Sequence, residues 1–301
     1  MKKILIIGSS GFVGKSIIEH INNNSKIFSI YTISRKKIFF KKKLKIYLKK
    51  ITKNILKVNR LPEVDFIIYL LRSSEIPKSL LYFNKFHTLL RKIKKKPKIL
   101  FVSSGAVYGK LNIGQKPNEN QIIKMNKINN LSGYKKKYAK EKIMMEKKFI
   151  KLSKQGYPIS IARCFTFVGN NIINYNYAIS DIIKSIQNKK KIILKNKEKT
   201  FRSYMHSYDM SRWLIKILKN SNTKCPIYNV GSDHEISLFK LSENLAKKYG
   251  NQVTFKKNKN NKIDYYVPSN FLAKKKLKLK ITIKTLNAIN SVINSKWKFQ
   301  L

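Results

Sequence analysis

The sequence predicts an α/β protein in which a doubly wound parallel sheet is followed by a smaller C-terminal lobe. Two patterns in the first half of the chain support this fold class. Short runs of Ile, Leu, Val and Phe alternate with segments long enough to form helices, as in parallel α/β sheets. The apolar runs are also continuous rather than interleaved with polar residues, which indicates strands covered on both faces.

The expected elements follow from this alternation along the chain. Strands are expected over residues 3–7, 27–33, 44–48, 66–71, 98–102, 157–162 and 227–230, with another centred on Tyr204. Helices are expected over 12–21, 77–93, 133–153, 178–187, 208–219, 238–248 and 283–294, and Pro268 should begin a turn or helix. Residues 110–132 are polar and predict a long loop, which in a compact domain is more often functional than idle. The lysine run at 189–199 is expected to be a solvated strand edge or turn.

The charge of the chain is unusual for its size. Its 301 residues are 43% hydrophobic, enough for a sizeable core, yet 66 Lys and Arg against 14 Asp and Glu give a net charge of +52. One interpretation is a phosphate-bearing partner, such as nucleic acid or an anionic membrane. The other is a drift in amino-acid usage toward Lys, Asn and Ile. We favour drift, because lysines occur in every segment and only seven residues are arginine, the side chain that suits bidentate contacts to nucleic acid.

Several classes of protein are not expected from this sequence. No apolar run is long enough to cross a bilayer, so membrane insertion is not expected. The first apolar run stops at Gly8 and is too short for a secretion signal. Cys164 and Cys225 give no disulfide framework, which fits a reducing, cytoplasmic location. The four histidines have no partners at metal-ligand spacing, so no metal site is expected.

A glycine-rich turn directly follows the first expected strand and opens the first expected helix. It runs from Gly8 to Gly14 with the sequence GSSGFVG. Glycine lets the backbone approach a pyrophosphate, and a helix N-terminus presents free N–H groups to it. The turn therefore predicts a dinucleotide site formed by Gly8, Ser10, Gly11, Phe12, Val13 and Gly14. A purely structural glycine turn is the alternative.

The end of the second expected strand bears on which dinucleotide would bind. Dinucleotide folds normally carry an acidic residue there to hold the adenosine ribose. This chain instead has Ser34, Arg35, Lys36 and Lys37, and lysine is too frequent in it to be informative. Arg35 suits a 2′-phosphate, so the sequence favours NADP(H), with NAD(H) left open.

A serine and a tyrosine–lysine pair form a candidate catalytic group. Ser104 ends an expected strand, while Tyr138 and Lys142 lie four residues apart on the long helix and share one face. A cation about 4 Å away could lower the phenol pKa of ~10 by roughly three units, toward working pH. With Ser104 bonded to the same reacting oxygen, the group suits hydride transfer at a carbinol or ketone carbon beside a nicotinamide. Taken alone, the tyrosine–lysine spacing is common in a lysine-rich chain.

Together these motifs resemble the extended short-chain dehydrogenase/reductases, specifically their nucleotide-sugar epimerase/dehydratase branch. The matching motifs are GSSGFVG at Gly8, SSGAVYG at Ser103, YAKEK at Tyr138, RCF at Arg163 and RSYMH at Arg202. The resemblance implies a Rossmann fold, NAD or NADP as cofactor, and Ser104, Tyr138 and Lys142 as catalytic residues. It also places Tyr138, Lys142 and Cys164 beside the cofactor, and Ser104 and Arg202 at a nucleotide-sugar substrate, with Arg202 at its diphosphate.

The same resemblance implies a domain organisation and an assembly. The NAD(P)-binding domain would span residues 1–165, with a return segment at 204–235. Residues 166–203 and 236–301 would form the substrate-binding lobe. A homodimer and a place in polysaccharide biosynthesis are also expected of this family.

Departures from the family pattern narrow the expected reaction. Family dehydratases carry an Asp-Glu pair where this chain has Gly105 and Ala106, and this disfavours 4,6-dehydration. Epimerisation and 4-keto reduction remain, and Arg35 favours an NADP(H) reductase. Residues 47–51 lack the usual adenine-binding acid, and residues 71–74 (LRSS) replace a pair of small residues. The alternative function is a catalytically idle scaffold that binds RNA or an acidic partner through its lysines.

Overall fold

A computed structural model describes residues 1–24, 28–38, 40, 44–73, 75–174, 177–194, 199–255 and 263–295. The chain divides into two compact units. The first unit consists of Met1–Gly109, Ile122–Cys164 and Ser211–Val230. The second unit consists of Lys110–Gln121, Phe165–Met210 and Gly231–Leu301, apart from the residues outside the description. Along the described part of the chain, no helix has the length and apolar character needed to cross a bilayer.

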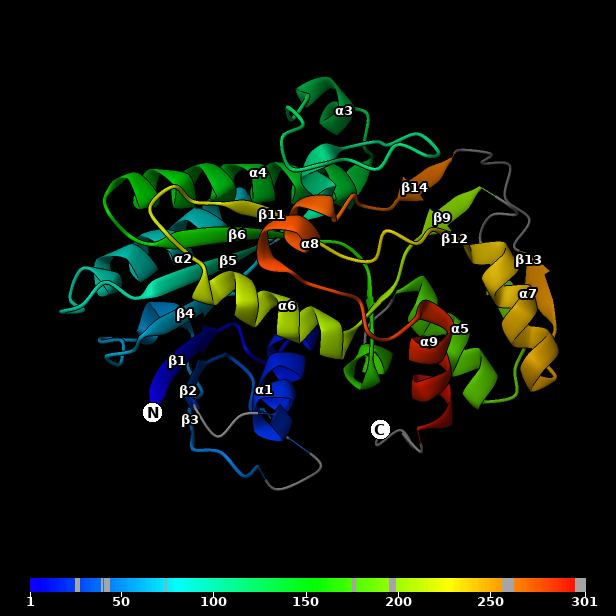
Figure 1. The fold of residues 1–301 in the computed structure, drawn as a ribbon, viewed down its shortest axis with the longest axis horizontal. Helices are drawn as coiled ribbons and strands as arrows, with labels where there is room; N and C mark the ends of the chain where they lie inside the picture. The colour runs from blue at the N-terminus through cyan, green and yellow to red at the C-terminus, as the bar shows by residue number, and fades with distance from the viewer. Residues whose placement is uncertain are drawn as a thin grey trace. The chain divides into compact units, whose positions relative to one another are not determined.

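A parallel sheet of seven strands forms the centre of the first unit (Figure 1). Its strands are β1 (Lys2–Ile7), β2 (Phe28–Ile33), β3 (Leu48–Ile51), β4 (Phe66–Tyr69), β5 (Lys98–Ser104), β6 (Ile159–Cys164) and β11 (Ile227–Val230). Their order is β11-β6-β5-β4-β1-β2-β3, and every pairing is parallel. The order reverses between β1 and β4, so the doubly wound prediction is confirmed. In such sheets ligands bind outside the carboxyl ends of the strands at this reversal.

Helices cover both faces of this sheet. They are α1 (Phe12–Asn24), α2 (Ile76–Leu90), α4 (Gly133–Lys154) and α6 (Ser207–Lys219). The short helix α3 (Met125–Asn129) packs against α4 and the 3₁₀ turn η2 (Gly105–Tyr108), and a second 3₁₀ turn is η1 (Ile55–Lys57). In Figure 1, α4 lies above the sheet, and α1 and α6 lie below it. The α4 side holds an aromatic cluster in which Phe149 of α4 stacks on Phe101 of β5 at 4.4 Å between ring centroids. Tyr69, Phe83 and Phe86 pack around Phe149.

In its described residues, the second unit consists of short strands and four helices. The strands are β7 (Phe167–Val168), β8 (Ile192–Leu194), β9 (Thr200–Arg202), β10 (Met205–His206), β12 (Ile236–Ser237), β13 (Val253–Phe255) and β14 (Asp264–Tyr266). The helices are α5 (Ala178–Gln187), α7 (Leu238–Tyr249), α8 (Phe271–Leu277) and α9 (Thr285–Asn294), with the 3₁₀ turn η3 (Asn170–Asn174). Buried Asp209 accepts hydrogen bonds from both the amide and the hydroxyl of Thr282, and so anchors the segment before α9.

The structure differs from the sequence-based expectation at three places. The third strand was expected at 44–48 but lies at Leu48–Ile51, because it is an edge strand whose position is set by the ladder to β2 and not by its apolar content. The expected loop 110–132 contains α3. Its first part belongs to the second unit, where Leu111 forms a β-bridge with Tyr265. The strand expected around Tyr204 is two short strands, β9 and β10, on either side of it.

The domain boundaries expected from the sequence are close to, but not identical with, those of the two compact units. Both place a break near residue 165, while the compact units assign 110–121 to the second unit and narrow the return segment to 211–230. The assignment of cofactor to the first unit and substrate to the second stays a prediction.

A buried ion pair joins α4 to β6 inside the first unit. Arg163 donates to both carboxylate oxygens of Glu146, at 3.1 and 2.8 Å. Ser103 of β5 donates to the same carboxylate at 2.6 Å. Arg163 also donates to the hydroxyl of Tyr108, which in turn donates to Asn229 of β11, each at 2.9 Å. The network therefore holds α4, three neighbouring strands and the turn η2 in one register.

Removal of the carboxylate charge should destabilise this arrangement strongly. Glu146→Gln leaves the buried guanidinium of Arg163 without its counter-charge, and loss of one partner of a buried pair costs about 3–5 kcal/mol. The measurement is urea unfolding. The control is Glu63→Gln, which removes the same charge from an exposed loop and should change the unfolding free energy by less than about 0.5 kcal/mol. Equal effects of the two variants would contradict this assignment.

Candidate active site

The glycine turn has the shape that the sequence predicts for a phosphate cradle. Gly8 has φ of +86°, and a Cβ there would lie 3.1 Å from the backbone of Leu70 and Leu71. A Cβ on Gly14 would lie 2.5 Å from the carbonyl oxygen of Ser9. At Gly11 the nearest atom to such a Cβ is 3.9 Å away, so the space above this residue is open.

These three environments fit a dinucleotide. Gly8 allows the tight turn, Gly14 allows the close packing of α1, and Gly11 leaves room for a pyrophosphate against the backbone. The first turn of α1 follows directly, with its N–H groups at the carboxyl edge of β1. The hydroxyl of Ser9, which is fully buried in this turn, has no hydrogen-bond partner in the structure.

Ser104 and Tyr138 meet at the carboxyl end of β5. Ser104 is the last residue of β5. Its hydroxyl accepts a 3.2 Å hydrogen bond from the amide N–H of Ala106, and this bond caps η2. Tyr138 lies on the second turn of α4, and its hydroxyl is hydrogen-bonded to Ser104. Residues 34 positions apart in sequence are thus joined at the edge where ligands of doubly wound sheets bind.

Lys142 lies one turn further along α4 and is almost completely buried. Its ammonium Nζ lies 5.7 Å from the ring centroid of Tyr138 and 3.7 Å from a carboxylate oxygen of Glu141. Glu141 is fully buried and accepts a 2.8 Å hydrogen bond from Ser79 of α2. The positive charge beside Tyr138 is therefore partly offset by a carboxylate that the sequence analysis did not single out.

This charge arrangement corrects one expectation. Lys142 was expected to lower the pKa of Tyr138 toward working pH, but in the structure burial raises the pKa of Tyr138 to about 12. The hydrogen bond from Ser104 and the charge of Arg72 act in the opposite direction without offsetting burial, and Glu141 raises the pKa further. Burial also lowers the pKa of Lys142, which Glu141 opposes. The phenol is consequently held in its protonated form at neutral pH.

Other residues expected at the site fall in both units. Arg35 is exposed directly after β2, at the carboxyl edge of the sheet. Cys164 pairs with Ser104 in the β5–β6 register, and burial raises its thiol pKa to about 12.

Arg202 belongs to the second unit, where its guanidinium donates to the carboxylate of Asp264 at 2.7 Å. Gly105 and Ala106 begin η2, so no carboxylate stands at the positions where family dehydratases have one.

One further aromatic ring, that of Tyr134, and one arginine, Arg72, extend the site beyond the residues found from sequence. Tyr134 stacks on Tyr138, with ring centroids 5.8 Å apart and planes 10° apart. Arg72, in the loop after β4, donates a 3.4 Å hydrogen bond to the hydroxyl of Tyr134. The only sequence signal for Arg72 was its departure from the small residues usual in that loop.

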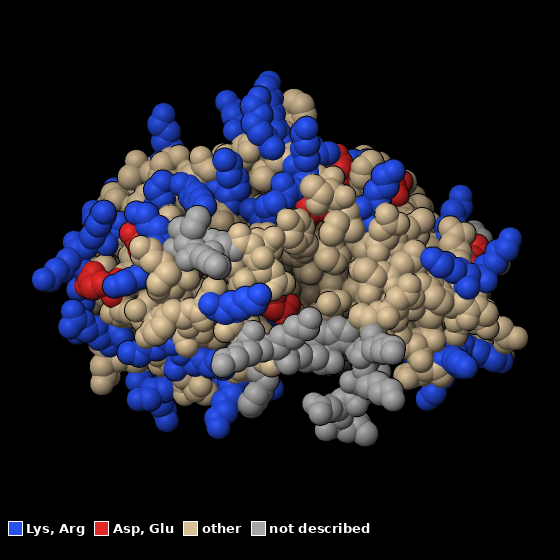
Figure 2. All heavy atoms as spheres, turned by 60° about the horizontal axis from the view of Figure 1, so that its bottom comes forward, with Lys and Arg blue, Asp and Glu red and all other residues tan. Residues whose placement is uncertain are grey.

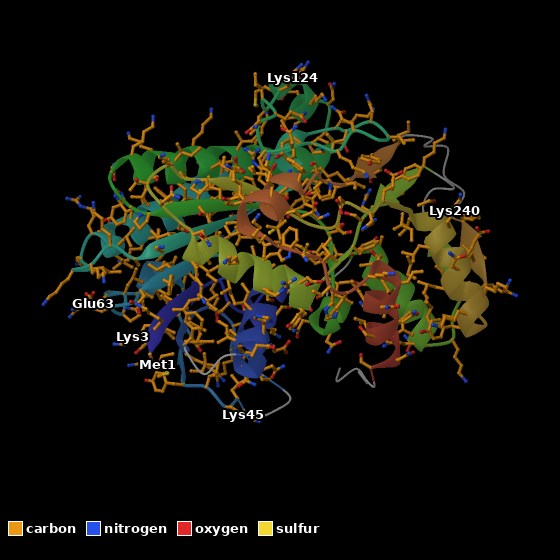
Figure 3. The ribbon with its side chains drawn as sticks, viewed as in Figure 1. Met1, Lys3, Lys45, Glu63, Lys124 and Lys240 are labelled. Atoms are coloured by element: carbon orange, nitrogen blue, oxygen red, sulfur yellow. The ribbon has the colours of Figure 1, made fainter. Side chains whose placement is uncertain are left out.

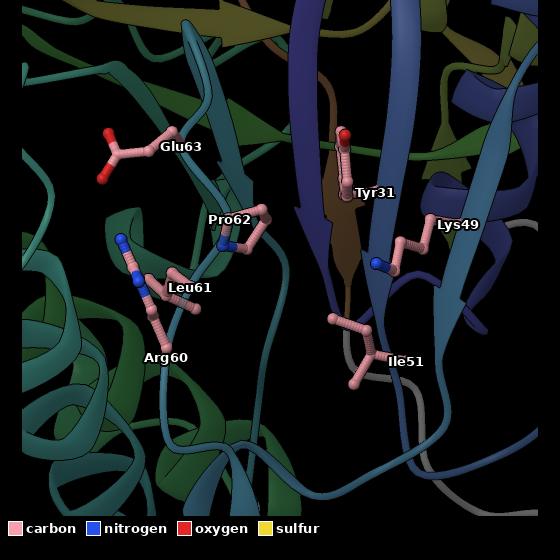
Figure 4. A pocket seen from close by; sticks show the side chains of 7 residues that line it. All are labelled: Tyr31, Lys49, Ile51, Arg60, Leu61, Pro62 and Glu63. Carbon is pink, nitrogen blue, oxygen red and sulfur yellow. The ribbon is translucent and has the colours of Figure 1, made fainter.

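A hollow beside strands β2 and β3 is separate from the candidate site. It has a volume of about 300 Å³ and is lined by Tyr31, Lys49, Ile51, Arg60, Leu61, Pro62 and Glu63. Figure 4 shows the strand side chains of Tyr31, Lys49 and Ile51 facing the loop that carries the other four. None of Ser104, Tyr138 and Lys142 lines this pocket, so it is not part of the candidate site.

Basic side chains are spread over the face shown in Figure 2 and do not form one patch. Lys45, Lys124 and Lys240 in Figure 3 are examples, because they are exposed and come from separate segments of the chain. This distribution agrees with drift in amino-acid usage more than with a dedicated polyanion surface.

A family model described as the NAD dependent epimerase/dehydratase family matches residues 4–231. The chain belongs to this family. A comparison with curated protein sequences gave no significant match. The family assignment therefore rests on the model match over most of the chain, which includes the glycine turn, Ser104, Tyr138 and Lys142.

Solved structures of epimerase and dehydratase enzymes share the fold. A dTDP-glucose 4,6-dehydratase from Bacillus anthracis, solved with NAD, has a TM-score of 0.81 at 16% identity, covering 99% of this chain and 98% of that one. A UDP-glucuronic acid 4-epimerase from Bacillus cereus, solved with UDP-glucuronic acid and NAD, has a TM-score of 0.78 at 18% identity, covering 97% and 98%. A UDP-N-acetylglucosamine 4-epimerase from Methanobrevibacter ruminantium has a TM-score of 0.74 at 16% identity, covering 97% of each chain. At 16–18% sequence identity, these comparisons show that the chains share a fold.

The pairing of Lys142 with Glu141 predicts a specific pH dependence of stability. Glu141→Gln removes the charge that opposes the effect of burial, so the native pKa of Lys142 should fall further below 10.5. Between that lowered pKa and 10.5 the unfolded state binds more protons than the native state, so the unfolding free energy of the variant should rise with pH. The slope should exceed that of the parent, up to about 1.4 kcal/mol per pH unit.

Urea unfolding at several pH values between 7 and 10.5 measures this slope. Glu243→Gln on α7, where the carboxylate is exposed, is the matched control and should keep the parent slope. A Glu141→Gln slope equal to that of the parent would show that Glu141 does not stabilise the charged form of Lys142.

Proposed function

We propose that this protein is an NAD(P)-dependent nucleotide-sugar 4-keto-reductase or epimerase that works through Ser104, Tyr138 and Lys142. The observation that carries the proposal is the hydrogen bond between Ser104 and Tyr138 at the carboxyl end of β5, with Lys142 on the next turn of the same helix. The open space above Gly11 supports a bound dinucleotide in the same unit. The substrate class comes from the family and from neighbours solved with UDP-sugars.

The chemistry of each residue follows from its position. NAD(P), when bound, supplies or accepts the hydride at the sugar carbon. Ser104 hydrogen-bonds the sugar oxygen and orients it toward Tyr138. Tyr138 donates its proton to the carbonyl oxygen as that oxygen gains charge, and it recovers the proton from solvent. Lys142 holds the ribose of the cofactor and stabilises the transient phenolate.

The protonated phenol of Tyr138 and the NADP(H)-compatible Arg35 both agree with the reductive direction. A phenol with a pKa of about 12 is protonated at neutral pH and is ready to donate a proton to a ketone. Epimerisation begins with removal of a proton from a hydroxyl and needs the ionised phenol first. Dehydration finds no general acid or base at Gly105 and Ala106. We therefore place 4-keto reduction ahead of epimerisation.

Replacement of the proton donor should abolish turnover. Tyr138→Phe keeps the ring against Tyr134 and removes the hydroxyl, so the rate should fall by at least about 10²-fold while cofactor affinity changes little. The assay is product analysis with NADH and NADPH against UDP-, CDP-, dTDP- and GDP-linked sugars and 4-keto sugars. Tyr47→Phe, on a ring that is 55% exposed, is the control and should keep full activity.

Two outcomes of that assay would count against the proposal. Full activity of Tyr138→Phe would remove Tyr138 from the reaction. Absence of any product from the parent protein, combined with polyanion binding that weakens steeply with salt, would favour the scaffold alternative.

The cofactor preference depends on Arg35. Its guanidinium, at the end of β2, would hold a 2′-phosphate that NADP(H) has and NAD(H) lacks. Arg35→Gln should weaken NADPH binding by about tenfold or more and leave NADH binding unchanged, as measured by fluorescence titration. Gly11→Ala should weaken both, because its methyl group would fill the open space of the cradle. Arg60→Gln, the same change in the remote pocket, should alter neither. Equal losses of both cofactors in Arg35→Gln would contradict the assignment.

A further inference from the structure

The region around Tyr138 contains a second cation that the family motifs do not include. Arg72 lies in the loop after β4, and β4 is the strand that pairs with β1 beside the glycine turn. Its guanidinium donates to the hydroxyl of Tyr134 at 3.4 Å. Tyr134 in turn lies nearly parallel to Tyr138, with ring centroids 5.8 Å apart. The loop of β4 and the first turns of α4 are thus connected through this aromatic pair.

The titratable groups that act on Tyr138 and Lys142 come from three elements. Arg72 of the β4 loop and Glu141 and Tyr134 of α4 act on Tyr138, and Glu141, Arg72 and Cys164 of β6 act on Lys142. Lys142 is paired with Glu141 at 3.7 Å, and this carboxylate offsets much of the positive charge that Lys142 adds. Arg72 adds a second positive charge on the Tyr134 side of the ring.

Building on the proposed function, we propose that Arg72 is a positioning residue for the reaction, which holds Tyr138 through Tyr134 and stabilises negative charge on the Tyr138 oxygen. Two observations support this role. Tyr134, one turn before Tyr138 on α4, stacks on the ring of Tyr138 and is itself hydrogen-bonded by Arg72. The charge of Arg72 also lowers the pKa of Tyr138, against the larger effect of burial. The cation that lowers the pKa of Tyr138 is thus Arg72, whereas Lys142 is paired with Glu141.

The sign of the expected change follows from the charge. A nearby cation favours a phenolate, so loss of the Arg72 charge should raise the pKa of Tyr138. Arg72→Gln should therefore raise this pKa by about 0.5 unit or more. Arg72→Lys keeps the charge and should restore most of the parent value. Tyr134→Phe keeps the stacked ring but removes both the hydroxyl that Arg72 contacts and a phenol that raises the pKa of Tyr138, so the net shift should be smaller than that in Arg72→Gln.

The titration can be measured without any turnover. The protein is labelled with 3-fluorotyrosine, whose phenol ionises at lower pH than that of tyrosine, and is followed by ¹⁹F NMR. The chain has 16 tyrosines, and the resonance missing from Tyr138→Phe identifies Tyr138. Arg91→Gln is the matched control, because Arg91 is exposed and lowers the pKa of Tyr157 instead. That variant should shift the Tyr157 resonance and leave the Tyr138 titration unchanged.

Kinetics give the second readout. When Tyr138 acts as proton donor, activity falls at high pH as the phenol ionises, so the basic limb of the kcat profile should move to higher pH in Arg72→Gln and return in Arg72→Lys. An unchanged Tyr138 titration and kcat profile in Arg72→Gln, with Tyr138→Phe still inactive, would overturn the role of Arg72 and leave the proposed function intact. Full activity of Tyr138→Phe would instead overturn the proposed function, whatever the titration shows.

Discussion

The ion pair between Glu146 and Arg163 is the interaction on which the candidate site depends. It joins α4 to β6, and through Ser103 and Tyr108 it reaches β5 and the turn that follows Ser104. A helix can slide along a sheet by a turn at modest cost when only apolar contacts hold it, but a buried carboxylate must stay opposite its guanidinium. Because Glu146 lies eight residues beyond Tyr138, this pair also determines where along β5 the phenol is placed.

The charges around Tyr138 explain how this site differs from the simplest reading of a tyrosine–lysine pair. A cation near a phenol lowers its pKa only to the extent that the cation is not already compensated. Here Lys142 is buried against Glu141, and burial of the phenol outweighs what remains. The result is a phenol that is protonated at neutral pH, as the proposed reductive reaction requires.

The large positive charge has no single location in the structure. Exposed lysines come from loops, strand ends and helices of both units, and the described carboxylates with structural roles are mainly buried or paired. Such a distribution raises repulsion across the surface of the described residues and makes stability sensitive to salt.

From the sequence alone, the parallel sheet and the glycine turn could be predicted correctly, because continuous apolar runs and fixed local spacings are visible along one chain. The same spacings nominated Ser104, Tyr138 and Lys142 as candidate catalytic residues, which stay a prediction. It misplaced β3, since an edge strand is positioned by its partner and not by its own pattern. Packing established that Glu141 compensates Lys142, that Arg72 reaches Tyr134, and that Arg202 pairs with Asp264. The last two contacts join residues from different elements, whereas Glu141 and Lys142 are neighbours on α4 whose interaction depends on their burial. Neither the contacts between elements nor the burial of a charge can be predicted from residue spacing in a chain so rich in lysine.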